Sequence, residues 1–364
     1  MEQSRRNRGL SRRNLLRGAG ALGLAGALPA APALAQPRAL TVSVWGGITQ
    51  DAIKAHVLPE FEKRTGATLA FDIGAQGARY NKLLAQKNSP SADVFFAGDE
   101  AIVAGHRAGV LTPAHRKSLS NLAEVAEWAM RVKEKVPDDM VPSVPFTMIA
   151  YMLGYNPELV KEKPTSWADM WRPEFRDKLA FAAPAHTLMP AFVIIAAELA
   201  GGSETNVEPG FKKLAELRPA KLAYFWTDWA ALDKTGDVTM ATEFDYYFEA
   251  MKDQKYPIDY VNPKEKGIGC PESVAIVAGT KNREIAEVFL DLMISAQVQE
   301  VFATQLYAGS INKTVKLSPA VEARCSCGAK IEELRYFDPA MFADNRPAWT
   351  ERLNIDVIPN WRAR

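Results

Sequence analysis

The sequence predicts an α/β protein with two lobes, each a mainly parallel sheet flanked by helices. Three observations support this. Strand-like apolar runs alternate with amphipathic helical runs from residue 39 onward, as in a parallel sheet covered on both faces. Two long β-rich segments, near 145–155 and 267–278, are suited to join the lobes as crossover hinge strands. The length of 364 residues exceeds that of a typical single domain. We place the lobes at 36–148 plus 275–364 and at 149–274.

Residues 1–35 are predicted to be a cleaved export signal. The sequence Ser-Arg-Arg-Asn-Leu-Leu-Arg at 11–17 is a twin-arginine pattern, and an apolar run of small residues follows it over 18–34. Ala33-Leu34-Ala35 offers a small-x-small cleavage site. The alternative is a membrane anchor, but the run is short and broken by two prolines. We therefore expect export by the twin-arginine pathway.

The charge of the whole chain is close to neutral. The formal net charge is +1, with 44 Lys and Arg against 43 Asp and Glu. Removing residues 1–35 takes away six Arg and one Glu, which leaves 38 basic and 42 acidic residues and a net charge of −4. Neither value points to nucleic acid or to an anionic membrane as a partner. No later apolar run reaches the ~18 residues that a membrane-spanning helix needs.

The three cysteines are predicted to contribute no metal site. Cys325 and Cys327 stand so close that we expect no comfortable bridge between them. A disulfide from Cys270 to one of these two, or three free thiols, remain the alternatives. The repeated Cys-x-x-Cys spacing of zinc and iron–sulfur sites is absent, and the chain has only four His. We expect no metal and no other cofactor.

The first lobe is predicted to begin with three buried strands and their helices. The strands are expected at Ala39–Trp45, Ala67–Asp72 and Ala92–Phe96. Between the first two, a helix capped by Thr49 buries Ile53, Val57 and Phe61, is kinked near Pro59 and ends at Gly66. A short helix is expected around Tyr80–Lys87, and another opens at Gly98-Asp99-Glu100.

Glycine-rich turns follow each of these strands. They are Gly46-Gly47, Gly74–Gly77 and Gly98-Asp99. Ligands bind beyond the carboxyl ends of such strands, and helix-start N–H groups there can hold an anionic group. Any one of these turns is best interpreted as an ordinary βα turn. Because all three are predicted on one rim of the sheet, a binding site and a set of ordinary turns are about equally well supported.

The second lobe is predicted to lie between the two hinge strands. Val141–Tyr155 leads outward. Strands are expected at Lys178–Ala182, Lys221–Trp226 and Asp237–Ala241, with helices over Thr187–Ala200 and Glu243–Gln254. The chain returns through a strand, Ser273–Ala278, and a helix that carries Ile285, Phe289, Leu292 and Met293 at helical spacing. A final helix is expected over Arg346–Ile358.

Acidic and aromatic residues are concentrated in this second lobe. They are Trp226, Asp228, Trp229, Glu243, Asp245, Tyr246 and Tyr247, with Glu272 nearby on the hinge segment, just before the return strand. Carboxylates beside aromatic faces suit a cationic amine. Structural roles compete: one Trp and one Tyr are expected in the core, and Asp228 could be a helix cap. No Gly-x-Ser-x-Gly, His-Glu-x-x-His or Walker sequence supports catalysis, so we expect a binding protein and not an enzyme.

These marks together resemble the extracellular solute-binding proteins of bacterial ABC importers, in the class of the spermidine/putrescine and ferric-ion binders. The resemblance rests on Val44-Trp45-Gly46-Gly47, Pro90–Phe96, Gly154-Tyr155-Asn156, Gly236-Asp237-Val238 and Pro263–Met293. It implies the type II periplasmic-binding-protein fold, closing by hinge motion around a small solute. It also implies a monomer in the periplasm that delivers its solute to the transmembrane permease.

The resemblance implies an amine-bearing, polyamine-like solute. The expected ligand-binding residues are Trp45, Gly46, Gln76, Asp99, Trp226, Asp228, Glu243, Asp245, Tyr246, Glu272 and Tyr307. Phe181–His186 lacks the acidic residues usual in polyamine binders. The alternative is a ferric-ion binder that uses Tyr246, Tyr247 and Glu100, although the usual His after the first strand is absent. A zwitterion with its anionic end at Gly46-Gly47 fits both sets, and an exported enzyme is the third interpretation.

Overall fold

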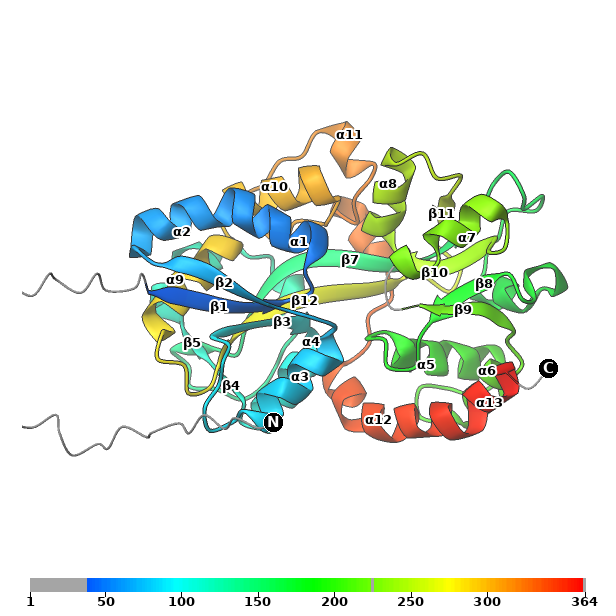
Figure 1. The fold of residues 1–364 in the computed structure, drawn as a ribbon, viewed down its shortest axis with the longest axis horizontal. Helices are drawn as coiled ribbons and strands as arrows, with labels where there is room; N and C mark the ends of the chain where they lie inside the picture. Colours follow the sequence, from blue (N-terminus) through cyan, green and yellow to red (C-terminus); the bar gives the residue numbers. More distant parts are fainter. Residues whose placement is uncertain (1–37, 224–225, 363–364) are drawn as a thin grey trace, which may run out of the picture. The chain divides into compact units, whose positions relative to one another are not determined.

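Two long antiparallel strands lie at the centre of a ten-stranded sheet and connect its two halves (Figure 1). The structure, a computed structural model, describes residues 38–223 and 226–362. The central strands are β7 (Val144–Tyr155) and β12 (Ile268–Val277). The order across the sheet is β2-β1-β3-β12-β7-β10-β8-β9, with β4 beside β12 and β11 beside β7. We call the half that contains β1 the first lobe and the half that contains β8 the second lobe; the residue boundaries predicted for them stay a proposal.

The first lobe is built on three parallel strands, as their apolar sequences predict. They are β1 (Ala39–Val44), β2 (Thr68–Ile73) and β3 (Val94–Gly98); β4 (Leu111–Thr112) runs antiparallel to β12. Its helices are α1 (Gly47–Ala52), α2 (Leu58–Thr65), α3 (Gln76–Ala85), α4 (Asp99–Arg107), α9 (Arg283–Met293) and α10 (Ala296–Leu306). Of the two crossover strands, β12 pairs with β3 and β4 of this half, and β7 pairs with β12 on its other side.

The predicted first helix is divided in the structure. A π-helical turn, Ile53–Val57, separates α1 from α2, and Pro59 lies in the first turn of α2, where proline is tolerated. Gly46, and not Thr49, is the N-cap of α1. The predicted apolar stripe is fully buried, and α2 ends at Gly66, whose φ is 66°.

The second lobe repeats the arrangement with its own parallel strands. They are β8 (Leu179–Ala182), β9 (Pro219–Ala223) and β10 (Met240–Phe244), with the short β11 (Asp259–Val261) antiparallel to β7. The helices are α5 (Met189–Leu199), α6 (Glu208–Ala215), α7 (Ala230–Thr235) and α8 (Asp245–Asp253).

The predicted strand Asp237–Ala241 begins too early. Gly236 closes α7 with a φ of 75°, and the amides of Asp237 and Val238 both donate to the carbonyl of Leu232. These hydrogen bonds cap the end of α7, so β10 begins only at Met240.

An aromatic cluster packs the first lobe against the crossover strand. Phe96 of β3 packs edge-to-face against Phe146 of β7 and Phe289 of α9, with ring centroids 5.1 and 6.1 Å apart. Phe61 of α2 packs against Phe289 at 6.0 Å. Burying each such side chain is worth about 1.5–3 kcal/mol, so the cluster holds strand, helix and hinge segment together.

The C-terminal segment follows a separate course along both lobes. Its elements are α11 (Pro319–Glu322), α12 (Pro339–Arg352), a π-helical turn (Leu353–Val357) and α13 (Ile358–Arg362). In Figure 1 α12 runs below α4 and α5, and it contacts both helices. The indole N–H of Trp361 donates to the carbonyl of Leu214 at the end of α6.

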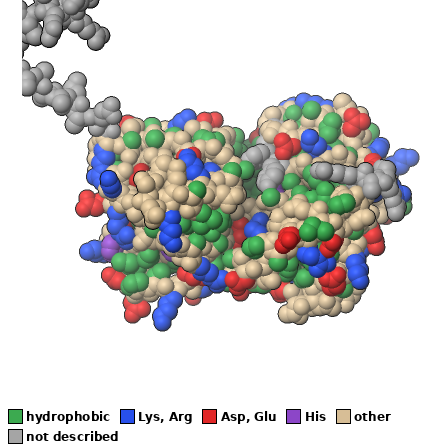
Figure 2. Space-filling model, turned by 60° about the horizontal axis from the view of Figure 1, so that its bottom comes forward, with side chains coloured by type: hydrophobic (Ala, Val, Ile, Leu, Met, Phe, Trp, Pro, Cys, Tyr) green, Lys and Arg blue, Asp and Glu red, His purple; other side chains and the backbone are tan. Residues whose placement is uncertain are grey.

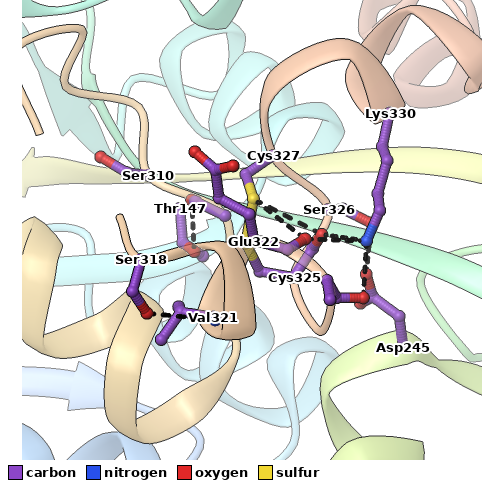
Figure 3. Close-up of a disulfide and its surroundings, with 12 residues drawn as sticks. Thr147, Asp245, Ser310, Ser318, Val321, Glu322, Cys325, Ser326, Cys327 and Lys330 are labelled. Carbon is purple, nitrogen blue, oxygen red and sulfur yellow. Dashed lines mark hydrogen bonds between the residues drawn. A yellow bond between two sulfur atoms is a disulfide. The ribbon is translucent and has the colours of Figure 1, made fainter. Parts of the chain in front are cut away.

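The cysteine prediction is wrong. Cys325 and Cys327 form a disulfide (Figure 3), and Cys270 is free and buried in β12. The chain turns tightly between the two residues, so their Cα atoms lie 5.5 Å apart, within the usual range for a bridged pair.

The remaining elements are short. A small separate pair of strands joins β5 (Ala114–His115) to β6 (Met140–Val141). Single 3-10 turns lie at Arg116–Ser118, Ser120–Glu124, Glu127–Ala129, Trp167–Trp171, Pro173–Phe175, Trp226–Asp228 and Gly328–Glu333. In the part of the chain that the structure describes, no helix is long and apolar enough to cross a membrane. The predicted export signal lies outside the described residues.

Candidate functional site

A small pocket of about 50 Å³ lies where the two lobes face each other beside β12. Trp45, Ala75, Gln76 and Gly77 line it from the first lobe. Ala185, His186, Thr187, Phe244, Tyr246 and Tyr247 line it from the second, and Glu272 lines it from β12. Apart from Glu272, which lies within β12, every contributing segment lies at or just after the carboxyl end of a strand, where ligands bind in such sheets. A volume of this size holds one or two waters, so a larger solute needs the lobes to separate before it enters.

The ring of Trp45 packs against the guanidinium of a buried arginine, Arg79. The guanidinium carbon of Arg79 lies 5.1 Å from the Trp45 ring centroid. The Arg79 side chain donates to the carbonyl oxygens of Ser43, Gly74 and Phe96 at 3.0, 2.8 and 2.9 Å. Burial lowers the pKa of Arg79 to about 10, against the opposing attraction of Asp72 and Glu272. Arg79 therefore stays charged at neutral pH and fixes the Trp45 wall of the pocket.

Gln76 is held in one orientation by two hydrogen bonds. Its Oε1 accepts from the amide of Gly98 and its Nε2 donates to Oε1 of Glu100, both at 2.8 Å. Gly98 has no room for a side chain, because a Cβ there would lie 2.6 Å from the Glu100 carboxylate. The start of α3 is thereby tied to the start of α4.

The second lobe contributes an aromatic wall. Tyr246 and Tyr247, in the first turn of α8, lie with ring centroids 3.9 Å apart, and their hydroxyls hydrogen-bond to each other. Burial raises the pKa of both phenols, and the nearby carboxylates Glu243 and Glu272 raise them further. Both tyrosines therefore remain neutral at physiological pH.

His186 is a neutral member of this wall. Its Nδ1 accepts from the amide of Leu188, which places the ring proton on Nε2. Burial lowers the pKa of His186 to about 3, and the positive charge of Arg346 lowers it further. Its ring lies 5.3 Å from that of Tyr151 and 5.9 Å from that of Phe244.

Glu272 is the acidic member of the described pocket lining. The β12–β7 pairing shifts register between Glu272 and Ser273, an irregularity that can redirect a side chain into a site. Burial raises the pKa of Glu272 to about 8; the charges of Glu100 and Asp99 act in the same direction, and Arg79 opposes them. A cation that enters the pocket would lower this pKa again and favour the carboxylate.

The structure brings Trp45, Gln76, Tyr246 and Glu272 of the predicted set together, with Tyr247 of the ferric alternative. Gly46 adjoins the pocket at the N-cap of α1. Its φ of 89° favours glycine, and a Cβ added there would lie 2.6 Å from a methyl carbon of Ile73, so no larger residue fits.

Asp245 lies away from the pocket and serves a structural purpose. Its Oδ1 accepts from the amides of Ala150 in β7 and Tyr246 in α8, at 3.0 and 2.9 Å. Its Oδ2 accepts from the hydroxyl of Ser326, between the two bridged cysteines (Figure 3). Burial raises the pKa of Asp245 to about 6. With its oxygens engaged in this way, it positions Tyr246 instead of facing a solute.

Asp99 and Glu100 line a second cavity of about 40 Å³, together with Arg131, Cys270 and Phe337 among others. Oδ1 of Asp99 accepts from the hydroxyl of Ser273 at 2.6 Å. Burial raises the pKa of Asp99 to about 7. Glu100, which the ferric alternative combines with the tyrosine pair, is thus not among the residues that line the pocket of Tyr246 and Tyr247.

The other predicted ligand residues also lie outside the pocket lining. Glu243 is buried in β10, where its Oε1 accepts from the amide of Phe244. Asp228 is exposed in the turn before α7. The hydroxyl of Tyr307 donates to Asp253 at 2.5 Å and accepts from Arg324 at 2.6 Å, at the far end of α8. The side chain of Trp226 lies outside the described part of the structure, whereas Trp229 is buried in the core.

Sequence reasoning placed the Gly74–Gly77 turn on the binding rim, but it missed Ala185, His186, Thr187 and Phe244 in the pocket lining. Ala185 and Thr187 carry no chemical signature of their own. Their position directly after a predicted strand is the signal that could have found them. On the face shown in Figure 2 acidic and basic side chains are intermixed, in agreement with the near-neutral charge.

Comparison with known proteins decides the family. Residues 57–325 match the family described as bacterial extracellular solute-binding protein. The chain belongs to this family. Such proteins bind small-molecule solutes and work with ABC permease components, so the protein is the solute-binding component of an ABC transporter and not an enzyme.

Individual relatives of this solute-binding protein are distant. A gamma-aminobutyric acid-binding protein of Pseudomonas aeruginosa is 27% identical over 94% of this chain and 96% of its own length. Spermidine/putrescine-binding periplasmic protein 1 of Haemophilus influenzae is 26% identical over 67% of this chain and 68% of its own. A crystal structure of an ABC transporter protein from Clostridium perfringens is 26% identical, with a TM-score of 0.70 over 87% of this chain and 99% of that one. These matches confirm the predicted two-lobed α/β fold and family.

Proposed function

We propose that this protein binds a small amine-bearing, polyamine-like solute in the pocket between its lobes and delivers it to a membrane permease. The observation that supports this is Glu272, a partly buried carboxylate that faces the same pocket as the rings of Trp45 and Tyr246. An ammonium group gains charge pairing from the carboxylate and cation–π attraction from the rings. Two relatives carry names that refer to amine solutes.

A zwitterionic amino acid is the second candidate. Of the residues described as lining the pocket, Glu272 alone is acidic, whereas a polyamine carries a cation at each end. At the opposite wall α3 begins with Ala75, Gln76 and Gly77, whose backbone could face a carboxylate. The Pseudomonas aeruginosa relative, which matches 94% of this chain, is named for gamma-aminobutyric acid.

The ferric alternative has less support. Tyr246 and Tyr247 share the pocket, but their raised pKa values disfavour the phenolate that binds iron. Among the described residues, no group of three or more His, Cys, Asp or Glu side chains is arranged to hold a metal ion.

A thermal-shift screen tests the proposal directly. We expect putrescine, spermidine or gamma-aminobutyric acid to raise the melting temperature, because a ligand that binds only the folded state stabilises it by RT ln(1 + [L]/Kd). Glu272→Gln should remove the shift, whereas Glu284→Gln, at an exposed position of α9, should keep it. A shift with ferric citrate and with none of the amines would overturn the proposal.

A further inference from the structure

Arg346 of α12 contacts both lobes beside the pocket. Its guanidinium donates to Oε1 of Glu100, at the start of α4, at 3.3 Å. The same group donates to the carbonyl of His186 at 3.1 Å and to that of Thr187, in the segment before α5. One side chain therefore connects the first lobe to a pocket-lining segment of the second.

The position of Arg346 follows from the packing of its helix. α12 contacts α4 of the first lobe and α5 of the second (Figure 1). The segment that follows the helix is fixed to the second lobe, where the indole N–H of Trp361 donates to the carbonyl of Leu214 in α6 at 2.7 Å. Arg346 is placed midway along this span, where it reaches across the junction.

The contacts form a continuous chain from one wall of the pocket to the other. Gln76 lines the first-lobe wall and donates to Glu100. Glu100 accepts from Arg346 through the same oxygen, Oε1. Arg346 in turn donates to the carbonyls of His186 and Thr187, which line the second-lobe wall.

We propose that Arg346 is a latch that holds the two lobes together in the solute-trapping form. This inference rests on the proposed function, in which the lobes close around a solute. Arg346 acts through Gln76, His186 and Thr187 and is a positioning residue, since it does not line the pocket itself.

The energetics favour a latch that can still open. Separating the lobes would break hydrogen bonds to a charged group and would leave Glu100, whose side chain is 7% exposed, without this cation. Against this, Nε of Arg346 is buried without a hydrogen-bond partner, and this desolvation weakens the net gain. The Arg346 side chain as a whole is 23% exposed, so water can take over its hydrogen bonds when the lobes part.

Distance measurements between spin labels test the latch without any solute. Nitroxides at Lys63→Cys in α2 and Glu162→Cys after β7 stand on different lobes, at positions whose side chains are 77% and 85% exposed. We expect Arg346→Ala to raise the ratio of long to short distances about tenfold in the purified, solute-free protein, as the loss of one charge-assisted contact predicts. Arg346→Lys keeps the positive charge but loses the planar guanidinium that donates to several acceptors at once. It should give a ratio of long to short distances between those of Arg346→Ala and the unsubstituted protein.

Arg352→Ala is the matched control. Arg352 lies on the same helix and pairs with Glu208 and Asp356, but with no first-lobe carboxylate among the residues that the structure describes. Arg352→Ala should change the ratio of long to short distances less than twofold.

Where a solute from the thermal-shift screen binds, Arg346→Ala should also raise its dissociation rate about tenfold. Equal distance distributions in Arg346→Ala and the unsubstituted protein would overturn the latch. Failure of all three amines to bind would overturn the proposed function alone, because the distances are measured without them.

Discussion

Several carboxyl groups near the junction of the lobes are buried with raised pKa values. Glu272 and Glu243 are raised to about 8, Asp99 to about 7 and Asp245 to about 6, in each case first through burial. Each group costs less to bury protonated than ionised. The solute-free protein therefore carries fewer negative charges here at neutral pH than its sequence indicates.

This has a consequence for stability against pH. Glu243 is 2% exposed, and its folded-state pKa of about 8 exceeds the usual value near 4.3. The folded state thus keeps a proton that the unfolded chain releases, so stability is present at low pH and is lost as pH rises through 8. We expect the free energy of unfolding in urea to fall between pH 5 and pH 8, and Glu243→Gln to reduce that fall by about 1–3 kcal/mol.

Glu284→Gln, at an exposed site, should leave this pH dependence unchanged. Glu272, Asp99 and Asp245 act in the same direction, so Glu243→Gln removes only part of the fall. A Glu243→Gln profile parallel to that of the unsubstituted protein would show that Glu243 is ionised when folded.

The candidate site was predictable at the residues that combine a chemical type with a place on the rim. Trp45 and Gln76 follow predicted strands, and Glu272 lies just before the predicted return strand, so order along the chain sufficed. Asp245 and Tyr307 have the right chemistry, but their side chains are occupied by Ser326 and by Arg324. Those partners come from the segment after α10, and no local pattern reveals such distant contacts.

At the scale of elements, the disulfide loop supports the hinge. Ser326 binds Asp245 (Figure 3), which in turn accepts from the amide of Ala150 in β7. On the same side Gly309 exchanges two backbone hydrogen bonds with Met148 of β7, at 2.7 and 2.9 Å. A Cβ on Gly309 would lie 2.0 Å from the carbonyl oxygen of Ser326, so the two segments touch. The loop therefore connects β7 with the helix that carries Tyr246.

Replacing Ser326 by Ala should destabilise the protein by about 1–3 kcal/mol, because a buried carboxylate loses a hydrogen-bond partner. Urea unfolding measures this. Ser89→Ala, at an exposed position, should change stability by less than about 0.5 kcal/mol. Equal losses for the two variants would contradict the role assigned to Ser326.

The sequence located elements better than it located their ends. Nearly continuous apolar runs identified the three strands of the first lobe and both crossover strands, since a strand buried on both faces needs such a run. The start of β10 was missed because capping bonds from Asp237 and Val238 extend the end of α7. The disulfide was missed because its closure depends on the turn at Ser326, which residue spacing alone does not specify.

For the molecule as a whole, the cysteines report on the intactness of the hinge. Cys270 pairs with Ile149 between the crossover strands and is 6% exposed. We expect Ellman's reagent to detect no fast-reacting thiol in the folded protein, one in guanidinium chloride, and three after reduction in the same denaturant. Three thiols in denaturant without reduction would contradict the Cys325–Cys327 bond.

β7 and β12 are hydrogen-bonded to each other where they pass between the lobes, so they form a ribbon and not two independent tethers. Bending perpendicular to the plane of this ribbon leaves the hydrogen bonds between β7 and β12 intact. Bending within the plane would stretch one row of these hydrogen bonds. The permitted motion is thereby confined to a single soft axis. Substitutions along the ribbon should accordingly change the amplitude and the rate at which the two lobes move apart. The direction of that motion should stay the same.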